Sequence, residues 1–167
     1  MSQTVSASGA ENGDVKGLGM VNMDLMSQFV SLFSDVSRIP SSMTPGQARQ
    51  LSPASLAYIG DAVYELYIRT LYLSPPRRLQ DYHHCVVAQV RAEKQAQHLG
   101  SLQLHLTDAE REIIRWGRNA VSRKPKRVAL ATYQQATSLE TLIGYLYLTD
   151  SQRLFQLLDY LESELTD

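Results

Sequence analysis

The strongest hydrophobic pattern of the chain lies in residues 52–73. Its apolar positions recur at steps of three and four, the spacing of one face of an α-helix: Leu56, Ile59, Val63 and Leu66. Ser52 can cap this helix, and Pro53 suits its first position because an N–H there would have no partner. Pro75 and Pro76 end the pattern. We therefore predict a helix over residues 52–73.

The same spacing predicts four more helices, at residues 81–99, 107–116, 137–148 and 151–165. The first of these is expected to turn four side chains inward: Val86, Val87, Val90 and Ala96. The next begins with a capping box, in which Glu110 follows Thr107 by three residues. Residues 117–130 are polar, contain a proline and are expected to form a loop. Since the chain shows no alternating strand pattern and no internal repeat, we predict an all-α helical bundle.

The first 50 residues differ in composition from the rest. Residues 1–22 are mostly Ser, Gly, Ala and polar residues and are expected to be a disordered tail. An apolar pattern at 24–36 fits either a short helix or an unstable extension. Residues 38–51 contain two prolines and a glycine, which favours a linker. The folded domain is therefore predicted to span residues 51–167.

Composition excludes several classes of protein. Hydrophobic residues make up 44% of the 167, enough for one core, but no run of ~18 apolar residues suggests a membrane span. The N-terminus lacks the pattern of a secretory signal. Cys85 is the only cysteine, which excludes an internal disulfide framework and fits the reducing cytoplasm. Without a CxxC or HExxH pattern no zinc site is expected, and His83 and His84 are predicted to be solvated or packed.

Two of the predicted helices carry an acid close to a mid-helix glycine. Asp61 follows Gly60, and Gly144 lies one turn after Glu140. Glycine costs roughly 1 kcal/mol relative to alanine inside a helix, a cost that close approach of a second helix can offset. If the two helices pack on each other, Asp61 and Glu140 come together. Two carboxylates in one cleft suit a hard cation such as Mg²⁺.

A third acid, Glu65, lies one turn after Asp61 on the same helix face. It also precedes Arg69 by four residues, the spacing of a helical ion pair worth a few tenths of a kcal/mol. Asp61 has no opposite charge at that spacing, so an ion pair explains Glu65 better than it explains Asp61.

The positive charge of the chain is concentrated in one segment. Seven of its 16 lysines and arginines fall in the 17 residues 111–127, opposed only by Glu112, so this segment carries +6 in a chain of net charge −1. The seven are Arg111, Arg115, Arg118, Arg123, Lys124, Lys126 and Arg127. Such a run is often only a solvated surface, but this concentration is typical of contact with nucleic-acid phosphates.

Three segments resemble the catalytic domain of ribonuclease III: YIGDAVYELYIR at Asp61, RWGRNA at 115–120 and ATSLETLIGYLYL at 136–148. The chain is most similar to the Mini-III ribonucleases, which lack a double-stranded-RNA-binding domain, and the likeness covers residues 51–161. It implies a helical homodimer that cleaves double-stranded RNA with Mg²⁺, or with Mn²⁺ in its place. The substrate implied is the precursor of large-subunit (23S) ribosomal RNA.

The resemblance also implies roles for single residues. Asp61 and Glu140 match metal ligands of the family, and Glu65 could reach the metal through water. Ala57 and Thr137 stand where full-length ribonuclease III has two more acids, which leaves the number of metals open. Contacts with RNA are implied for Arg115, Arg118, Asn119, Arg123, Lys124, Lys126 and Arg127.

Tyr58 matches the aromatic residue that inserts into the partner subunit in this family, so it is a candidate dimer contact. The two absent acids favour an alternative, in which the chain is a non-catalytic helical RNA-binding or ribosome-assembly module derived from this fold. The retained Asp61 and Glu140 favour the enzyme.

Overall fold

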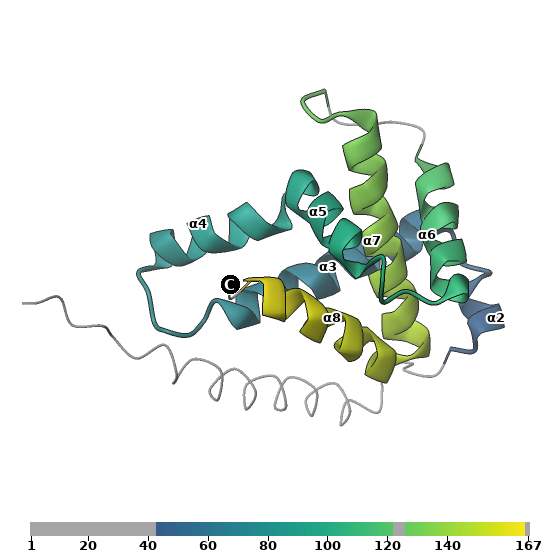
Figure 1. The fold of residues 1–167 in the computed structure, drawn as a ribbon, viewed down its shortest axis with the longest axis horizontal. Helices are drawn as coiled ribbons and strands as arrows, with labels where there is room; N and C mark the ends of the chain where they lie inside the picture. Colours follow the sequence, from purple (N-terminus) through teal and green to yellow (C-terminus); the bar gives the residue numbers. More distant parts are fainter. Residues whose placement is uncertain (1–42, 122–125, 166–167) are drawn as a thin grey trace, which may run out of the picture.

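The structure is a computed structural model that describes residues 43–121 and 126–165, with side chains up to Glu162. Within these residues it contains helices and no strand, which confirms the predicted all-α class (Figure 1). The helices are α2 (Pro45–Ala48), α3 (Pro53–Leu71), α4 (Leu79–Val90), α5 (Ala92–Leu102), α6 (Asp108–Ala120), α7 (Leu130–Thr149) and α8 (Ser151–Leu165). The tail predicted at 1–22 and the short helix or extension at 24–36 lie outside the described residues.

The central helix of the fold is α7, and α3, α5 and α6 pack along it (Figure 1). Its buried residues are spread over several faces: Ala136, Ser138, Leu139, Thr141, Leu142, Ile143, Gly144, Leu146 and Leu148. A helix that is apolar on several faces must be covered from several sides. Further core contacts come from α8, through Leu154, Leu157, Leu158 and Leu161. In the described part of the chain, no helix has both the length and the apolar character needed to cross a membrane.

The α6 and α7 helices are longer than predicted. α6 continues to Ala120 instead of ending at Trp116, and α7 begins at Leu130 instead of Thr137. The prediction of a loop throughout 117–130 is therefore wrong at its N-terminal end. Residues 130–136 contain neither proline nor glycine, so nothing prevents a helix there. Their mixture of polar and apolar side chains hides the helical period.

The predicted helix at 81–99 is two helices, because Arg91 adopts an extended backbone between α4 and α5. The break turns α5 onto α7, while α4 buries only Val86. Val87 is 44% exposed, so its inward placement was wrong. His83 and His84 are exposed on α4. The break contains neither proline nor glycine, so we attribute it to the packing of α5 on α7.

The segment expected to be a linker contains the one-turn helix α2. Thr44 and Gln47 form a capping box around its first turn, and the side chain of Ala48 is fully buried. The backbone N–H of Met43 donates to the carbonyl of Leu148 at 3.1 Å. Residues 43–48 are thus fixed to the end of α7, although their composition is that of a turn.

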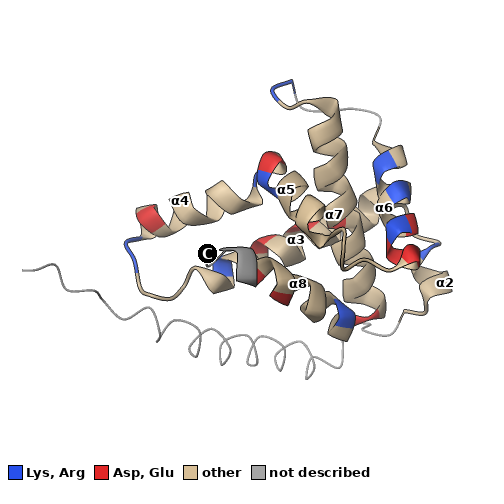
Figure 2. Ribbon diagram, in the orientation of Figure 1, with Lys and Arg blue, Asp and Glu red and all other residues tan. Residues whose placement is uncertain are grey.

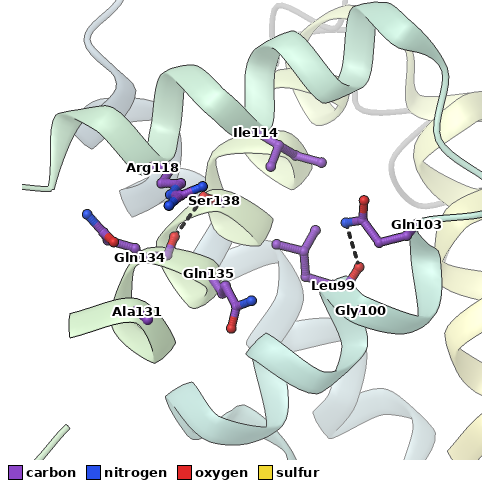
Figure 3. Close-up of a pocket in the computed structure, with 9 residues that line it drawn as sticks. All are labelled: Leu99, Gly100, Gln103, Ile114, Arg118, Ala131, Gln134, Gln135 and Ser138. Atoms are coloured by element: carbon purple, nitrogen blue, oxygen red, sulfur yellow. Dashed lines mark hydrogen bonds between the residues drawn. The ribbon is translucent and has the colours of Figure 1, made fainter. Parts of the chain in front are cut away.

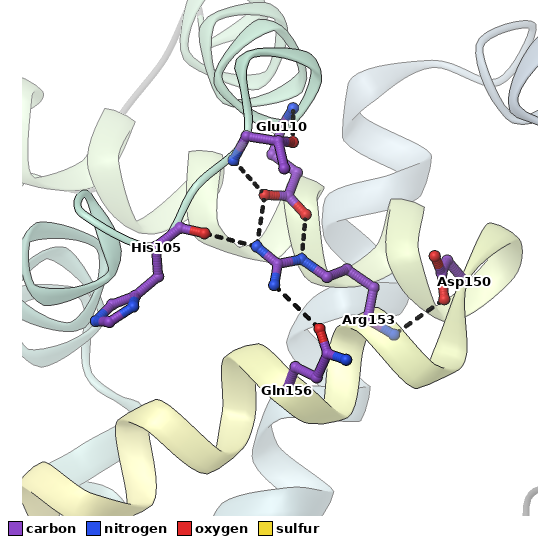
Figure 4. Close-up of polar contacts among 6 residues, drawn as sticks. His105, Glu110, Asp150, Arg153 and Gln156 are labelled. Carbon is purple, nitrogen blue, oxygen red and sulfur yellow. Dashed lines mark hydrogen bonds and ion pairs between the residues drawn. The ribbon is translucent and has the colours of Figure 1, made fainter.

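The start of α6 is held to α8 by a buried ion pair (Figure 4). Thr107 and Glu110 form the predicted capping box, with the N–H of Thr107 donating to Glu110 at 2.7 Å. Arg153 donates to both carboxylate oxygens of Glu110, at 2.7 and 3.1 Å, and to the carbonyl of His105 at 2.6 Å. Burial raises the pKa of Glu110, but the hydrogen bonds from Arg153 and Thr107 outweigh it and lower the pKa overall.

Candidate active site

The backbones of α3 and α7 touch where Gly60 meets Gly144. A Cβ on Gly60 would lie 2.7 Å from the carbonyl carbon of Glu140 and 2.8 Å from the nitrogen of Gly144. A Cβ on Gly144 would lie 2.9 Å from the carbonyl carbon of Leu56. Cβ atoms essentially never approach other atoms this closely, so both positions require glycine. The predicted close packing of the two helices is confirmed, and it brings Asp61 next to Glu140.

Burial and neighbouring charges raise the pKa of both acids. Burial raises the pKa of Glu140 to about 7, and the negative charge of Asp61 adds to the effect. The pKa of Asp61 is also raised, first by partial burial and then by the charge of Glu65. A side-chain hydrogen bond from Gln95 lowers the pKa of both. The three acids thus form a cluster with Gln95 against it.

Glu65 forms the ion pair with Arg69 that their spacing of four residues predicts. Arg69 donates to its carboxylate at 2.5 Å, on a solvent-exposed part of α3. Glu65 nevertheless lies near enough to Asp61 to raise its pKa. Ionic contact with Arg69 and proximity to the site are therefore compatible.

The sequence analysis missed Gln95, which α5 brings to the acid pair. Its side chain is only 2% exposed. Its amide oxygen has no hydrogen-bond partner among the described residues. The sequence does hold a signal, because Gln95, Leu99 and Leu102 share one helix face at steps of four and three and only the first is polar.

The two positions where acids of full-length ribonuclease III are absent differ from each other. Ala57 is buried on α3 and has no polar side-chain atom. Thr137 lies one turn before Glu140 on α7, and its hydroxyl is buried without a hydrogen-bond partner in the described part of the chain. The second position therefore keeps an oxygen.

The donor set around Asp61 and Glu140 fits a hard divalent cation. It offers two carboxylates that repel one another, and cation binding would relieve that repulsion. It also offers buried neutral oxygens on Gln95 and Thr137. Within residues 43–121 and 126–165 no group of three or more His, Cys, Asp and Glu could hold a metal. Any cation here would thus be held by a mixture of charged and neutral oxygens.

The basic residues lie on α6 and on the turn before α7 (Figure 2). Arg115, Arg118 and Asn119 are exposed on α6. Lys126 and Arg127 are exposed in the turn, whereas Arg123 and Lys124 lie outside the described residues. These five residues of the predicted RNA-binding set are therefore solvent-accessible.

A cavity of about 360 Å³ opens between α5, α6 and α7 (Figure 3). Arg118 lines it from α6, and Gln134, Gln135 and Ser138 line it from α7. The hydroxyl of Ser138 donates to the carbonyl of Gln134 at 2.6 Å. Arg118 thus lines a cavity beside α7, the helix that carries Glu140. The sequence predicted a role for Arg118 but not for the glutamines around it.

Tyr58 lies on α3 three residues before Asp61, and its side chain is 83% exposed. An aromatic ring this exposed gains little from its own chain. Its neighbour Ala57 is buried, so Tyr58 stands on the outward face of α3.

Comparisons with known proteins show the family of the chain. The ribonuclease III domain family matches residues 54–151. The chain is 53% identical over 133 residues to the Mini-ribonuclease 3 of a Synechocystis species, a match that covers 78% of this chain and 93% of that protein. It is 59% identical over 114 residues to the Mini-ribonuclease 3 of Thermosynechococcus vestitus, covering 66% of this chain and 76% of that protein.

A solved structure agrees as well. The crystal structure of a Fusobacterium nucleatum protein superposes with a TM-score of 0.61 at 27% identity, covering 66% of this chain and 92% of that one. The family match spans α3 to the start of α8 and so includes both Asp61 and Glu140. The chain belongs to the ribonuclease III domain family, within its Mini-ribonuclease 3 group, and is an endoribonuclease of that group.

Proposed function

We propose that the chain cleaves double-stranded RNA with Mg²⁺, for which Mn²⁺ can substitute, and that its site is built on Asp61 and Glu140. The observation that supports this most is the acid pair at the crossing of α3 and α7. Two glycines bring the helices into contact there, and burial and mutual repulsion raise the pKa of Glu140 to about 7. A structural role does not call for two mutually repelling acids, whereas cation binding does.

The chemistry follows from the charges on the phosphodiester. When bound, a divalent cation supplies an activated water at neutral pH and offsets the charge that develops on the phosphoryl oxygens. Asp61 and Glu140 would hold that cation. Because the pKa of Glu140 is about 7, part of the protein carries a proton there at neutral pH, and cation binding would displace it. The products implied by the family carry 5′-phosphate and 3′-hydroxyl ends.

The RNA backbone would be held by α6 and the turn before α7. Arg115, Arg118 and Asn119 are exposed on α6, and Lys126 and Arg127 extend the positive surface toward the start of α7. Double-stranded RNA is recognised mainly through its shape, its phosphates and its 2′-hydroxyls. An exposed basic surface suits that mode of recognition.

Cleavage of both strands requires two sites. A two-fold homodimer provides them, because duplex RNA has a local two-fold axis of its own. The exposed ring of Tyr58 supports this assembly, since an aromatic side chain that fills a partner's pocket is a common interface anchor. The natural substrate we propose is the precursor of 23S ribosomal RNA, and the site of action is the cytoplasm.

A long RNA duplex incubated with purified protein, with and without Mg²⁺, tests the proposal. Cleavage that depends on the cation is the expected result. Binding of the duplex without cleavage at any Mg²⁺ or Mn²⁺ concentration would instead support the non-catalytic RNA-binding module.

A further inference from the structure

Two buried oxygens, one on Gln95 and one on Thr137, lack the hydrogen bonds that buried oxygens normally make. Among the described residues, neither the amide oxygen of Gln95 nor the hydroxyl of Thr137 has a partner. Buried polar atoms in folded proteins are satisfied in the great majority of cases. An unsatisfied one costs about 1–3 kcal/mol, so two at one place call for an explanation.

The side chain of Gln95 lies near the acid pair, because it lowers the pKa of both Asp61 and Glu140. Only 2% of the residue is exposed, so this amide is fixed between α5 and the crossing of α3 and α7. Since the terminal torsion of glutamine is broad and roughly two-fold, a half turn can exchange the NH₂ and the oxygen.

The hydroxyl of Thr137 differs from five other helical hydroxyls in the described part of the chain. Those of Thr70, Ser101, Ser138, Thr141 and Thr149 each donate to the carbonyl four residues earlier. A Ser or Thr hydroxyl inside a helix commonly makes this hydrogen bond. The hydroxyl of Thr137 does not make it. Because Thr137 precedes Glu140 by three residues, the two side chains lie on one face of α7.

We propose that Gln95 and Thr137 supply two neutral oxygen ligands that, with the carboxylates of Asp61 and Glu140, hold the divalent cation. The inference rests on the proposed function, because it concerns the same cation. It accounts for both unsatisfied oxygens at once. Amide and hydroxyl oxygens are suitable ligands for hard cations, although weaker than carboxylates.

Neutral ligands also suit the charge of this cluster. Asp61 already interacts unfavourably with both Glu65 and Glu140, and a further carboxylate would add to the repulsion in the cation-free protein. Without a cation, the NH₂ of Gln95 lies against the two carboxylates and stabilises their ionised forms. With a cation present, the amide rotates and offers its oxygen. Gln95 thus serves both states of the site, which a carboxylate in its place could not do.

The test measures Mn²⁺ binding to the RNA-free full-length protein by electron paramagnetic resonance of the free ion. Gln95→Met keeps the length of the side chain and removes its oxygen, and Thr137→Val keeps the shape and removes the hydroxyl. Each is expected to raise the Kd for Mn²⁺ by roughly tenfold, the low end of the effect of removing groups that support a metal site. Thr137→Ser restores the oxygen and is expected to bind Mn²⁺ like wild type.

Two matched controls report on general effects of the substitutions. Gln97→Met changes an exposed glutamine of α5, the helix that carries Gln95. Thr132→Val changes a threonine on α7, five residues before Thr137. Both are expected to leave the Kd unchanged. If Gln95→Met does not fold, Gln95→Glu replaces it, because a charged oxygen at this position should bind Mn²⁺ at least as tightly as wild type.

The results separate this inference from the proposed function. A Kd within twofold of wild type for Gln95→Met or Thr137→Val overturns the ligand assignment of that residue, and so does weaker binding by Gln95→Glu. Cleavage of duplex RNA by the wild type tests the proposed function independently. A protein that binds Mn²⁺ through these residues but never cleaves RNA contradicts the function and leaves the ligand set standing.

Discussion

Gly60→Ala is the change that tests most sharply how the fold builds the site. The new Cβ would lie 2.7 Å from the carbonyl carbon of Glu140, against 3.4 Å for ordinary contact, and nearer still to the carbonyl oxygen. The opposing atoms belong to the backbone and cannot rotate away. α3 and α7 must therefore separate by at least about 0.7 Å at the point where Asp61 meets Glu140.

Two effects on stability oppose one another in this variant. Alanine favours the helix by about 1 kcal/mol over glycine. Overpacking costs typically ~1–3 kcal/mol, and contact with a rigid backbone places this case at the upper end or beyond. The net loss is about 2 kcal/mol, which lowers the Tm by roughly 4–8 °C for a protein of this size. A displacement of this order between reacting groups can lower the rate of cleavage ~100-fold.

The assay compares Gly60→Ala with Gly100→Ala in thermal melting and in RNA cleavage. Gly100 also lies inside a helix, but a Cβ there would meet nothing within 4 Å. Gly100→Ala is therefore expected to keep or slightly raise the Tm, by the helix preference of alanine alone. If Gly60→Ala melts no lower than Gly100→Ala and cleaves RNA at the wild-type rate, the close contact of α3 and α7 is refuted.

Three other predictions concern the basic segment, the candidate dimer contact and the ion pair of Glu110. Replacing Arg123, Lys124, Lys126 and Arg127 by neutral residues should weaken RNA binding. The slope of log affinity against log salt concentration should become less steep by nearly one unit for each phosphate that is no longer neutralised. An unaltered slope would mean that the segment is only a solvated surface. Tyr58→Ala should weaken self-association in sedimentation at low protein concentration; an undiminished dimer would exclude the ring as an anchor. Glu110→Gln should cost about 2 kcal/mol of stability at neutral pH. Because the pKa of Glu110 is lowered on folding, its contribution is complete above the usual value of 4.5 and disappears as pH falls through the lower folded pKa, so denaturation curves of variant and wild type should converge in acid.

The acid pair could be predicted from the sequence because every step was local. Asp61 and Glu140 each lie within one turn of a glycine. Glycine destabilises the interior of a helix, and this cost indicated that two helices pack closely there. The structure contains the crossing. The pairing of Glu65 with Arg69 followed equally directly from their spacing of four.

The neutral part of the site could not be predicted in this way. Gln95 reaches the acids only because the chain breaks at Arg91 and turns α5 onto α7, and the sequence at Arg91 carries no sign of a break. Thr137 lay at the expected start of a helix, where a hydroxyl caps the backbone. In the structure it lies in the second turn of a longer α7, where a hydroxyl normally bonds to the helix and this one does not.

The most direct test of the central claim is the single-turnover rate of RNA duplex cleavage by Asp61→Asn and Glu140→Gln at saturating RNA and Mg²⁺. Each substitution replaces the negatively charged carboxylate by a neutral amide and keeps the shape of the side chain. If Asp61 and Glu140 hold the cation, both variants should fold and bind RNA like wild type and yet show no detectable cleavage. A rate within about tenfold of wild type for either variant, equivalent to ~1.4 kcal/mol in the barrier, would contradict the role assigned to that residue.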